Sequence, residues 1–382
     1  MRILLVNHGA AGAWGGGDGV QIRETAKRLQ QRGHEVVGVN ADQPDCRGFD
    51  LVHLFNCRVE GSFHQQMASC KAAGVPVVVS PIWISLARAL WGSRGSTLVL
   101  SQAMQQGEAS AGPLLEQLRK REMVVQLEHG PVNAEGNGDC CWPLNRERLR
   151  QLLREADGLL PNSWLELQAL RSDLQWDGDC FEIAHYGVDP SLFLDADPEP
   201  FRQHTGIPGA FVMQAGRIEP GKNQAMLCWA LRHTDIPIVL IGGSKHWPSY
   251  AELCRSISGS RLTVVEHMPQ TLLASAYAAA AVHTLPSWME TCGLVSLEAA
   301  LSGTPIVGST FGHELEYLEA DAWYADPGDA ASIRNAVLAA MEAGRQHHRP
   351  IAMKRKVLER FNWERTVDAT ERLYHRVLER RN

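Results

Sequence analysis

Short apolar runs alternate with helix-forming segments along the chain, and this alternation most constrains the fold. Strands that alternate with helices are typical of parallel sheets with helices on both faces. Because 382 residues are too many for one typical core, we predict an α/β protein with two doubly wound parallel sheets. The predicted strands are residues 2–9, 34–40, 50–56, 75–80 and 123–130 in the first half, and 210–216, 236–243, 262–268, 281–287, 305–310 and 322–327 in the second.

The domain limits follow from composition and periodicity. Residues 191–209 are rich in proline, aspartate and glycine, which is typical of a linker. We therefore expect an amino-terminal domain over residues 1–190 and a second domain over residues 210–361. The apolar spacing predicts a helix over residues 362–382. Its residues on or near one face are Val367, Leu373 and Val377.

Charge and cysteine usage exclude several classes of protein. The net charge of -6 and the lack of a long basic run argue against a nucleic-acid partner. The nine cysteines form no C-x-x-C pair, so neither a disulfide framework nor a zinc site is indicated. No apolar run approaches the ~20 residues of a membrane span, and no secretory signal precedes the first strand. We expect a cytoplasmic protein. The basic carboxyl-terminal end could touch anionic lipid, but a solvated helix end is commoner.

A glycine-rich segment follows the first predicted strand. Residues 10–20 read AAGAWGGGDGV and lead into a predicted helix, an order typical of phosphate-binding loops. A nicotinamide dehydrogenase would need G-x-G-x-x-G, but Val20 occupies the last glycine position after Gly15 and Gly17. Gly16 and Gly17 are candidate phosphate-binding residues, and we expect Asp18 to cap the helix.

Two glutamates flank a glycine in the segment PSWMETCGLVSLEAALSGTPIV, residues 286–307. The spacing predicts a helix that starts near Gly293 and stops by Gly303. A loop that enters a helix in this way offers free backbone N–H groups to a phosphate. If Glu290 and Glu298 shared one helix they would lie roughly 12 Å apart along its axis, which weakens a glycoside hydrolase interpretation. For an arbitrary pair at this spacing, two solvated surface glutamates remain the commoner explanation.

The segment from Glu290 to Glu298 resembles the E-x(7)-E signature of family 4 retaining glycosyltransferases, which have the GT-B fold. The resemblance implies two Rossmann-like domains facing a cleft, with the carboxyl-terminal helix crossing back onto the first domain. It also implies that Glu290 lies at the donor sugar and that Glu298 holds the ribose hydroxyls. Residues 157–163 resemble a family strand near the cleft. The glycine loop resembles the loop whose glycine pair approaches the donor diphosphate in this family, which implies donor binding by Gly16 and Gly17. The donor-binding candidates next to Glu290 are Thr291, Cys292, Gly293 and Leu294.

A basic pair follows the first predicted strand of the second domain, in Gly216-Arg217-Ile-Glu-Pro-Gly-Lys222. On position alone, a solvated pair would be equally reasonable. The resemblance implies that Arg217 and Lys222 form the diphosphate clamp, Arg through its planar fork and Lys as a compact charge. The remaining donor-side candidates are Gly242 and Gly243, where backbone could approach the donor, and His267 and Met268, near the nucleobase.

The sequence departs from the family pattern after residues 75–80. Many members carry a histidine there, but this chain reads Ser80-Pro81-Ile82-Trp83. His129 is a candidate on the acceptor side, although a lone histidine is more often a hydrogen-bonded structural residue. No general base can be named from the sequence.

The resulting expectation is a retaining glycosyltransferase, most simply a hexosyltransferase. It would move a sugar from a nucleotide-diphosphate donor to an acceptor hydroxyl. No cofactor and no metal are expected, because Arg217, Lys222 and the N–H groups of residues 292–294 would stabilise the leaving diphosphate. Two alternatives stay open: a nucleotide-sugar epimerase, and a catalytically silent nucleotide-sugar-binding protein of the same fold.

Overall fold

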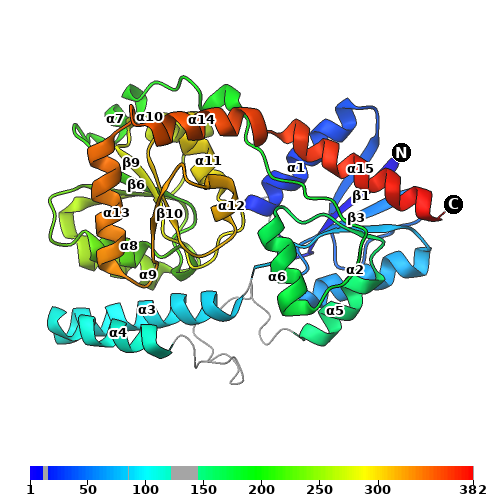
Figure 1. Cartoon of the computed structure of the whole chain (residues 1–382), viewed down its shortest axis with the longest axis horizontal. Helices are drawn as coiled ribbons and strands as arrows, with labels where there is room; N and C mark the ends of the chain where they lie inside the picture. Colours follow the sequence, from blue (N-terminus) through cyan, green and yellow to red (C-terminus); the bar gives the residue numbers. More distant parts are fainter. Residues whose placement is uncertain (12–15, 85, 122–144, 382) are drawn as a thin grey trace. The chain divides into compact units, whose positions relative to one another are not determined.

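A computed structural model describes residues 1–11, 16–84, 86–121 and 145–381, and the chain divides into two compact units. Among the described residues, the first unit contains 1–84, 145–187 and 360–381. The second unit contains 86–121 and 188–359. Each unit is built on one parallel sheet with helices on both sides (Figure 1). The predicted α/β fold with two doubly wound parallel sheets is confirmed.

The first sheet has the strand order β2-β1-β3-β4-β5, and all its pairs are parallel. Its strands are β1 (Arg2–Asn7), β2 (Glu35–Asn40), β3 (Leu51–Phe55), β4 (Val77–Ser80) and β5 (Gly158–Leu159). β5 is much shorter than the strand expected over residues 157–163, because the chain turns at Pro161 toward a helix capped by Ser163. The strand predicted at 123–130 lies outside the described residues.

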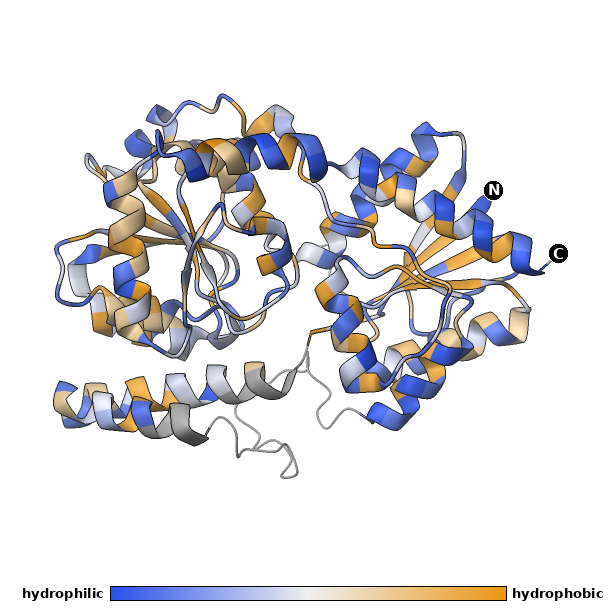
Figure 2. Ribbon diagram, viewed as in Figure 1, coloured by the Kyte–Doolittle hydropathy of each residue, from blue (hydrophilic) through white to orange (hydrophobic). Residues whose placement is uncertain are grey.

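Helices α1 and α15 pack together on the first sheet, and their apolar faces close its core. The predicted carboxyl-terminal face is buried, with Val367, Leu373 and Val377 in contact with that core. Figure 2 shows the strands as the most apolar part of this unit, with polar residues on the outer helix faces. The helices are α1 (Gly16–Gln31), α2 (Glu60–Ala73), α5 (Arg146–Glu155), α6 (Trp164–Leu174) and α15 (Trp363–Arg381).

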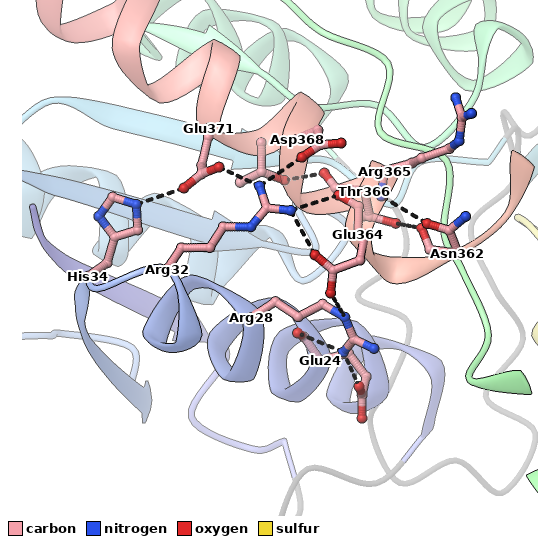
Figure 3. A network of polar contacts seen from close by, with 11 residues as sticks. Glu24, Arg28, Arg32, His34, Asn362, Glu364, Arg365, Thr366, Asp368 and Glu371 are labelled. Atoms are coloured by element: carbon pink, nitrogen blue, oxygen red, sulfur yellow. Dashed lines mark hydrogen bonds and ion pairs between the residues drawn. The ribbon is translucent and has the colours of Figure 1, made fainter. Parts of the chain in front are cut away.

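An ion-pair network joins α1 to α15 and fixes the carboxyl-terminal helix on the first unit (Figure 3). The Arg32 guanidinium binds Glu364 at 2.8 Å, Asp368 at 2.8 Å and Glu371 at 2.5 Å. His34 at the start of the next segment also contacts Glu371, at 2.8 Å. Residues more than 300 positions apart in sequence are therefore linked by charge as well as by apolar packing.

The second sheet has the order β11-β10-β9-β6-β7-β8, again with parallel pairs throughout. Its strands are β6 (Val212–Ala215), β7 (Ile238–Ile241), β8 (Leu262–Val265), β9 (Val282–Leu285), β10 (Ile306–Ser309) and β11 (Trp323–Ala325). Each strand falls within a predicted apolar run. The sequence order reverses between β6 and β9, a position where parallel α/β sheets commonly bind ligands at the carboxyl ends of their strands.

The helices of the second unit cover both faces of its sheet (Figure 1). Longer ones are α8 (Gln224–Ala230), α9 (Pro248–Ser258), α10 (Gln270–Ala279), α11 (Leu294–Leu301), α13 (Ala330–Ala343) and α14 (His348–Arg360). Short ones are α12 (Glu314–Leu318) and the 3-10 turns η2 (Pro190–Leu192), η3 (Pro220–Lys222) and η4 (Gly259–Arg261).

The expected linker at 191–209 contains structure that composition did not indicate. Helix α7 (Glu199–Thr205) forms within it and belongs to the second unit. Phe201 is fully buried against Phe211, with ring centroids 5.6 Å apart, and its N–H donates to Ser275 Oγ at 2.9 Å. The segment is therefore anchored to the second unit at Phe201, although most of its other residues are exposed or half-buried.

A helical hairpin from the first half of the chain packs on the second unit. It consists of α3 (Leu86–Gln106), the 3-10 turn η1 (Glu108–Ser110) and α4 (Ala111–Arg121). α3 contacts α8, α9 and η3, and Val99 and Leu100 join the core of the second unit. The expectation of one domain over residues 1–190 was wrong for this hairpin, because its apolar face is complementary to α8 rather than to the first sheet.

Within the described part of the chain, no helix combines the length and the apolar character needed to span a bilayer.

Candidate functional site

Two loops at the carboxyl ends of β6 and β9 lock together in the second unit. Asn223, which follows η3 in a left-handed conformation (φ 63°), donates from Nδ2 to Pro286 O at 2.9 Å and to Pro327 O at 2.8 Å. In return, the backbone N–H groups of Trp288 and Met289 donate to Gly221 O at 2.9 and 3.2 Å. These bonds fix residues 286–290 against the turn that carries Lys222.

The locked loops bring together Lys222 and Glu290, two of the predicted site residues. Lys222 Nζ lies 2.5 Å from Glu290 Oε2, and both side chains are largely buried. Burial alone would lower the pKa of Lys222, but the charges of Glu290 and Glu219 outweigh it and raise that pKa. The site therefore holds an ammonium and a carboxylate in a partly water-excluded place, where charges interact more strongly than at the surface.

Arg217 lies at the edge of this site. Its side chain is 60% exposed, and Nη2 contacts Glu219 Oε1 at 3.3 Å. Its carbonyl accepts a bond from Gln224 Nε2 at 2.8 Å, which orders the backbone of the loop. The Arg217 charge opposes the raised pKa of Lys222, so the two cations influence one another. The predicted basic pair thus consists of one buried and one solvent-facing member.

The backbones after β6 and β7 approach each other closely at two glycines. A Cβ on Gly242 would lie 2.0 Å from Gly216 O, and both glycines have positive φ angles (148° and 129°). Only residues without a side chain fit there. Gly243 follows, and the His267 ring lies 3.9 Å from the position of a Cβ on it. His267 is exposed and Met268 half-buried, so both candidates line the carboxyl-end edge of the sheet.

The entry to α11 follows the prediction, since the helix runs from Leu294 and Gly293 precedes it with φ 66°. The Ser296 and Leu297 N–H groups donate to Gly293 O. Cys292 is buried, which raises the pKa of its thiol, while the Leu294 N–H opposes that effect. Thr291 is half-buried beside them.

Glu298 lies one turn into α11 and is half-buried. Its Oε2 accepts a hydrogen bond from the Tyr277 hydroxyl at 2.9 Å. Burial raises the pKa of Glu298 to about 7, and the Tyr277 hydrogen bond opposes that rise. The carboxyl is thus oriented by α10 and titrates close to neutral pH.

Sequence reasoning missed a third carboxyl, that of Glu314. It is fully buried at the carboxyl end of β10, where Ser309 N donates to its Oε1 at 2.9 Å. Its Oε2 lies 2.5 Å from the position of a Cβ on Gly293. Burial, reinforced by the charge of Glu290, raises the pKa of Glu314 to about 8. The sequence signal that could have identified Glu314 is its position shortly after the strand predicted over residues 305–310, which pairs with β9.

His313, also missed, adjoins Glu290. Its backbone N–H donates to Glu290 O at 3.1 Å, and burial lowers the pKa of its ring to about 4. The neighbouring Gly312 has φ 123°, and a Cβ there would lie 2.9 Å from Glu290 O. Glu290 is therefore enclosed from two sides, by η3 and by the turn after β10.

The candidates in the first unit have a different local structure from the one expected. Gly16 and Gly17 form the first turn of α1 rather than a loop, and Asp18 lies within the helix. Asp18 is not the cap, because the helix already begins at Gly16, and its Oδ2 instead accepts from Asn56 Nδ2 at 2.7 Å. His129 lies outside the described residues.

The fold of the chain is that of GT-B glycosyltransferases. Sucrose-phosphate synthase from Thermosynechococcus elongatus superposes with a TM-score of 0.74 at 18% identity, covering 100% of both chains. HepE from Anabaena, in complex with UDP-glucose, gives a TM-score of 0.70 at 16% identity and covers 98% of this chain and 99% of its own.

Sequence comparison relates part of the chain to glycosyltransferases. Residues 210–343, which contain the site of the second unit, match the model of "Glycosyl transferases group 1". A D-inositol 3-phosphate glycosyltransferase of Mycolicibacterium smegmatis is 30% identical over 254 residues, 62% of this chain and 56% of its own length. One from Mycobacterium leprae is 32% identical over 194 residues, 47% and 44% of the two chains. The predicted resemblance to family 4 glycosyltransferases is confirmed. The chain spans about half the length of these relatives.

Proposed function

We propose that this protein is a retaining glycosyltransferase that moves a hexose from a nucleotide-diphosphate sugar to an acceptor hydroxyl. The observation that carries the proposal is the Lys222–Glu290 pair, at 2.5 Å, within the segment that matches the glycosyltransferase family. A cation for a leaving diphosphate and a carboxylate for sugar hydroxyls stand side by side, as the transfer of a sugar requires.

In the proposed reaction, the bond between C1 of the donor sugar and the diphosphate oxygen breaks, and a bond from C1 to the acceptor oxygen forms. Negative charge develops on the diphosphate. Lys222 and Arg217 stabilise this charge, the first from a partly buried position and the second from the rim. The departing phosphate oxygen takes the acceptor proton. Two protein cations perform the role that a metal ion has elsewhere, so the proposal includes no metal or other cofactor.

Other residues of the second unit would hold the rest of the donor. Glu298, oriented by Tyr277, would accept hydrogen bonds from the ribose hydroxyls. Gly242 and Gly243 would let the backbone approach the donor, while His267 and Met268 would border the nucleobase. Within the first unit taken by itself, the α1 amino terminus at Gly16 and Gly17 has free N–H groups that would suit a phosphate, so both glycines stay donor-binding candidates of the proposal.

The donor and acceptor classes remain part of the proposal. HepE has been crystallised with UDP and with UDP-glucose, which makes UDP-hexoses the first donors to test. The matched relatives are named for D-inositol 3-phosphate, which makes a phosphorylated polyol the first acceptor to test. We also propose a cytoplasmic location, since the described cysteines are buried free thiols that suit a reducing compartment.

A two-part experiment tests the function. First, a thermal-shift screen with UDP-, ADP- and GDP-hexoses should identify a donor, because a ligand at 100 times its Kd stabilises a protein by about 2.7 kcal/mol. Second, release of nucleoside diphosphate is followed with and without acceptor alcohols, and the product's anomeric configuration is determined by NMR. Acceptor-dependent release with retention supports the proposal. Binding without release indicates a silent binding protein, and an isomerised donor indicates an epimerase.

A further inference from the structure

Gly92 of the α3–α4 hairpin packs against Trp288, which lies in the loop that carries Glu290. A Cβ on Gly92 would lie 2.4 Å from Trp288 Cε3 and 2.5 Å from Trp288 Cδ2. Two nonbonded carbons at optimal separation are about 3.5–4.0 Å apart, so no side chain fits between them. The indole ring of Trp288 therefore rests directly on the α3 backbone.

Trp288 is enclosed on its other sides as well. Its ring is 1% exposed, and Cη2 lies 3.3 Å from the position of a Cβ on Gly328. The Phe311 ring packs against it with centroids 6.4 Å apart. An added methyl group on α3 could not be accommodated by a small rotation of the indole, because neighbours confine the ring on the far side too.

The helix cannot readily move away from Trp288 either. Val99, Leu100 and Ala103 of α3 are buried in the core of the second unit. At the hairpin tip, Glu108 binds Arg232 Nε at 3.2 Å. Pressure from a side chain at position 92 would therefore act mainly on Trp288.

Trp288 transmits its position to the Lys222–Glu290 pair through the backbone. Its N–H and that of Met289 bond to Gly221 O, one residue before Lys222, and Glu290 follows Met289. We propose that Gly92 is a positioning residue: by lacking a side chain, it seats Trp288 so that the two loops hold Lys222 and Glu290 together. The catalytic consequence depends on the proposed function, whereas the effect on the pair itself does not.

The test compares Gly92→Ala with Gly112→Ala, a matched control on α4. Gly112 is exposed, and a Cβ there would meet nothing within 4 Å. Both changes add one methyl to a helix of the same hairpin and raise helix propensity by up to about 1 kcal/mol. Lysines are 13C-labelled by reductive methylation, and the Lys222 signal is assigned from its loss in Lys222→Arg.

We expect Gly92→Ala to lower the pKa of the Lys222 amine toward its ordinary value of about 10.4, and Gly112→Ala to leave it unchanged. Glucosyl transfer from UDP-glucose should fall about tenfold in kcat for Gly92→Ala, the size of effect produced by about 1.4 kcal/mol. An unchanged Lys222 pKa in a folded Gly92→Ala protein would overturn the proposal. If the pKa falls but wild type transfers no sugar from any donor, the positioning role stands and the proposed function fails.

A double variant tests the contact between Gly92 and Trp288 directly. Trp288→Leu removes the ring atoms that a methyl at position 92 would meet. The double variant Gly92→Ala, Trp288→Leu should therefore lower the Lys222 pKa by less than the sum of the two single changes. Strict additivity in the Lys222 pKa would count against direct contact between the two positions. If Gly92→Ala does not fold, Trp288→Leu alone gives the measurement: removal of the ring should also lower the Lys222 pKa, and no change would refute the role of Trp288.

Discussion

Lys222 and Glu290 are 68 residues apart in sequence, yet their charged groups meet at 2.5 Å. The contact depends on the docking of one loop on another rather than on either loop alone. Each group balances the charge of the other in a place with little water, so replacing one leaves its partner buried and unpaired.

Replacement of either member of this pair should impair turnover. We expect Lys222→Ala and Glu290→Ala each to lower kcat by ~100-fold or more, as loss of one transition-state stabiliser commonly does. Because the two groups act together, the double variant should lose much less than the product of the single losses. Lys71→Ala, on exposed α2 and paired with Glu155 at 3.4 Å, is the matched control. Near wild-type rates in either site variant would contradict the assignment.

Arg217 should contribute differently. Because its side chain is 60% exposed, its attraction for the donor diphosphate is screened by water and salt. Arg217→Ala should lower kcat/KM for the donor by roughly tenfold at low salt, because the lost charge stabilises the diphosphate in the transition state, and the effect should shrink as salt rises. Steady-state kinetics at two ionic strengths measure this. A large, salt-independent loss of kcat would instead place Arg217 at the reacting atoms.

Tyr277→Phe should weaken nucleotide binding. The variant removes the hydrogen bond to Glu298, and a typical one contributes about 1 kcal/mol, or roughly fivefold in Kd. Since that bond opposes the burial that raises the pKa of Glu298 to about 7, its loss should raise the pKa further. Calorimetric titration with UDP should show the deficit to be largest near pH 7 and smaller at higher pH. A pH-independent deficit would disconnect Glu298 from the ribose.

Glu314 should make stability depend on pH. Its pKa in the folded protein is about 8, raised by burial, against about 4.3 in an unfolded chain. The folded state therefore holds a proton that the unfolded state has lost between these values. Its contribution to stability is present below about pH 4 and is lost as pH rises to about 8. The groups facing it are Glu290, Lys222, Ser296 and Ser309, which Glu314→Gln leaves in place.

The Tm of Glu314→Gln should accordingly fall less than that of wild type between pH 5 and pH 8. Glu298 has a raised pKa as well and contributes to the slope in both proteins, so the informative quantity is the difference between them. Parallel Tm profiles would show that Glu314 does not titrate in this range.

The network between α1 and α15 should stabilise the first unit. Arg32 is about a quarter exposed and binds three carboxylates, so Arg32→Ala should destabilise by about 1–2 kcal/mol, less in high salt. The bonds from Arg32 and His34 outweigh burial and lower the pKa of Glu371. The Glu371 carboxylate therefore contributes to the stability of the first unit above its ordinary pKa, and this contribution is lost as pH falls from that value through the lowered pKa of the folded protein. Arg47→Ala, which removes an exposed pair with Asp45, should leave the denaturation midpoint unchanged.

The strands and the entry to α11 were predictable from sequence because they depend on local signals. Apolar runs marked the described strands other than β5, which only the family resemblance suggested, and Gly293 adopts the left-handed conformation that a glycine before a helix suggests. Lys222 and Glu290 could be named from their motifs. Their contact could not be derived, because it depends on Asn223 bonding to carbonyls of two distant loops.

The sequence was less informative where tertiary packing overrides composition. Proline and glycine suggested a linker at 191–209, but Phe201 had a buried partner and α7 formed. The α3–α4 hairpin was assigned to the first domain, because the sequence around Val99 and Leu100 predicts an apolar helix face but does not indicate the sheet against which that face packs. Glu314 was missed because one carboxylate after a strand looks like a solvated one.

The hairpin also has a consequence for biosynthesis. α3 and α4 leave the ribosome well before α8 and α9, the helices they cover, at an elongation rate of about 5–20 residues per second. During those seconds the apolar side chains of Val99 and Leu100 have no native surface to bind. The apolar face of α3 is therefore exposed to solvent in the nascent chain until the later helices emerge.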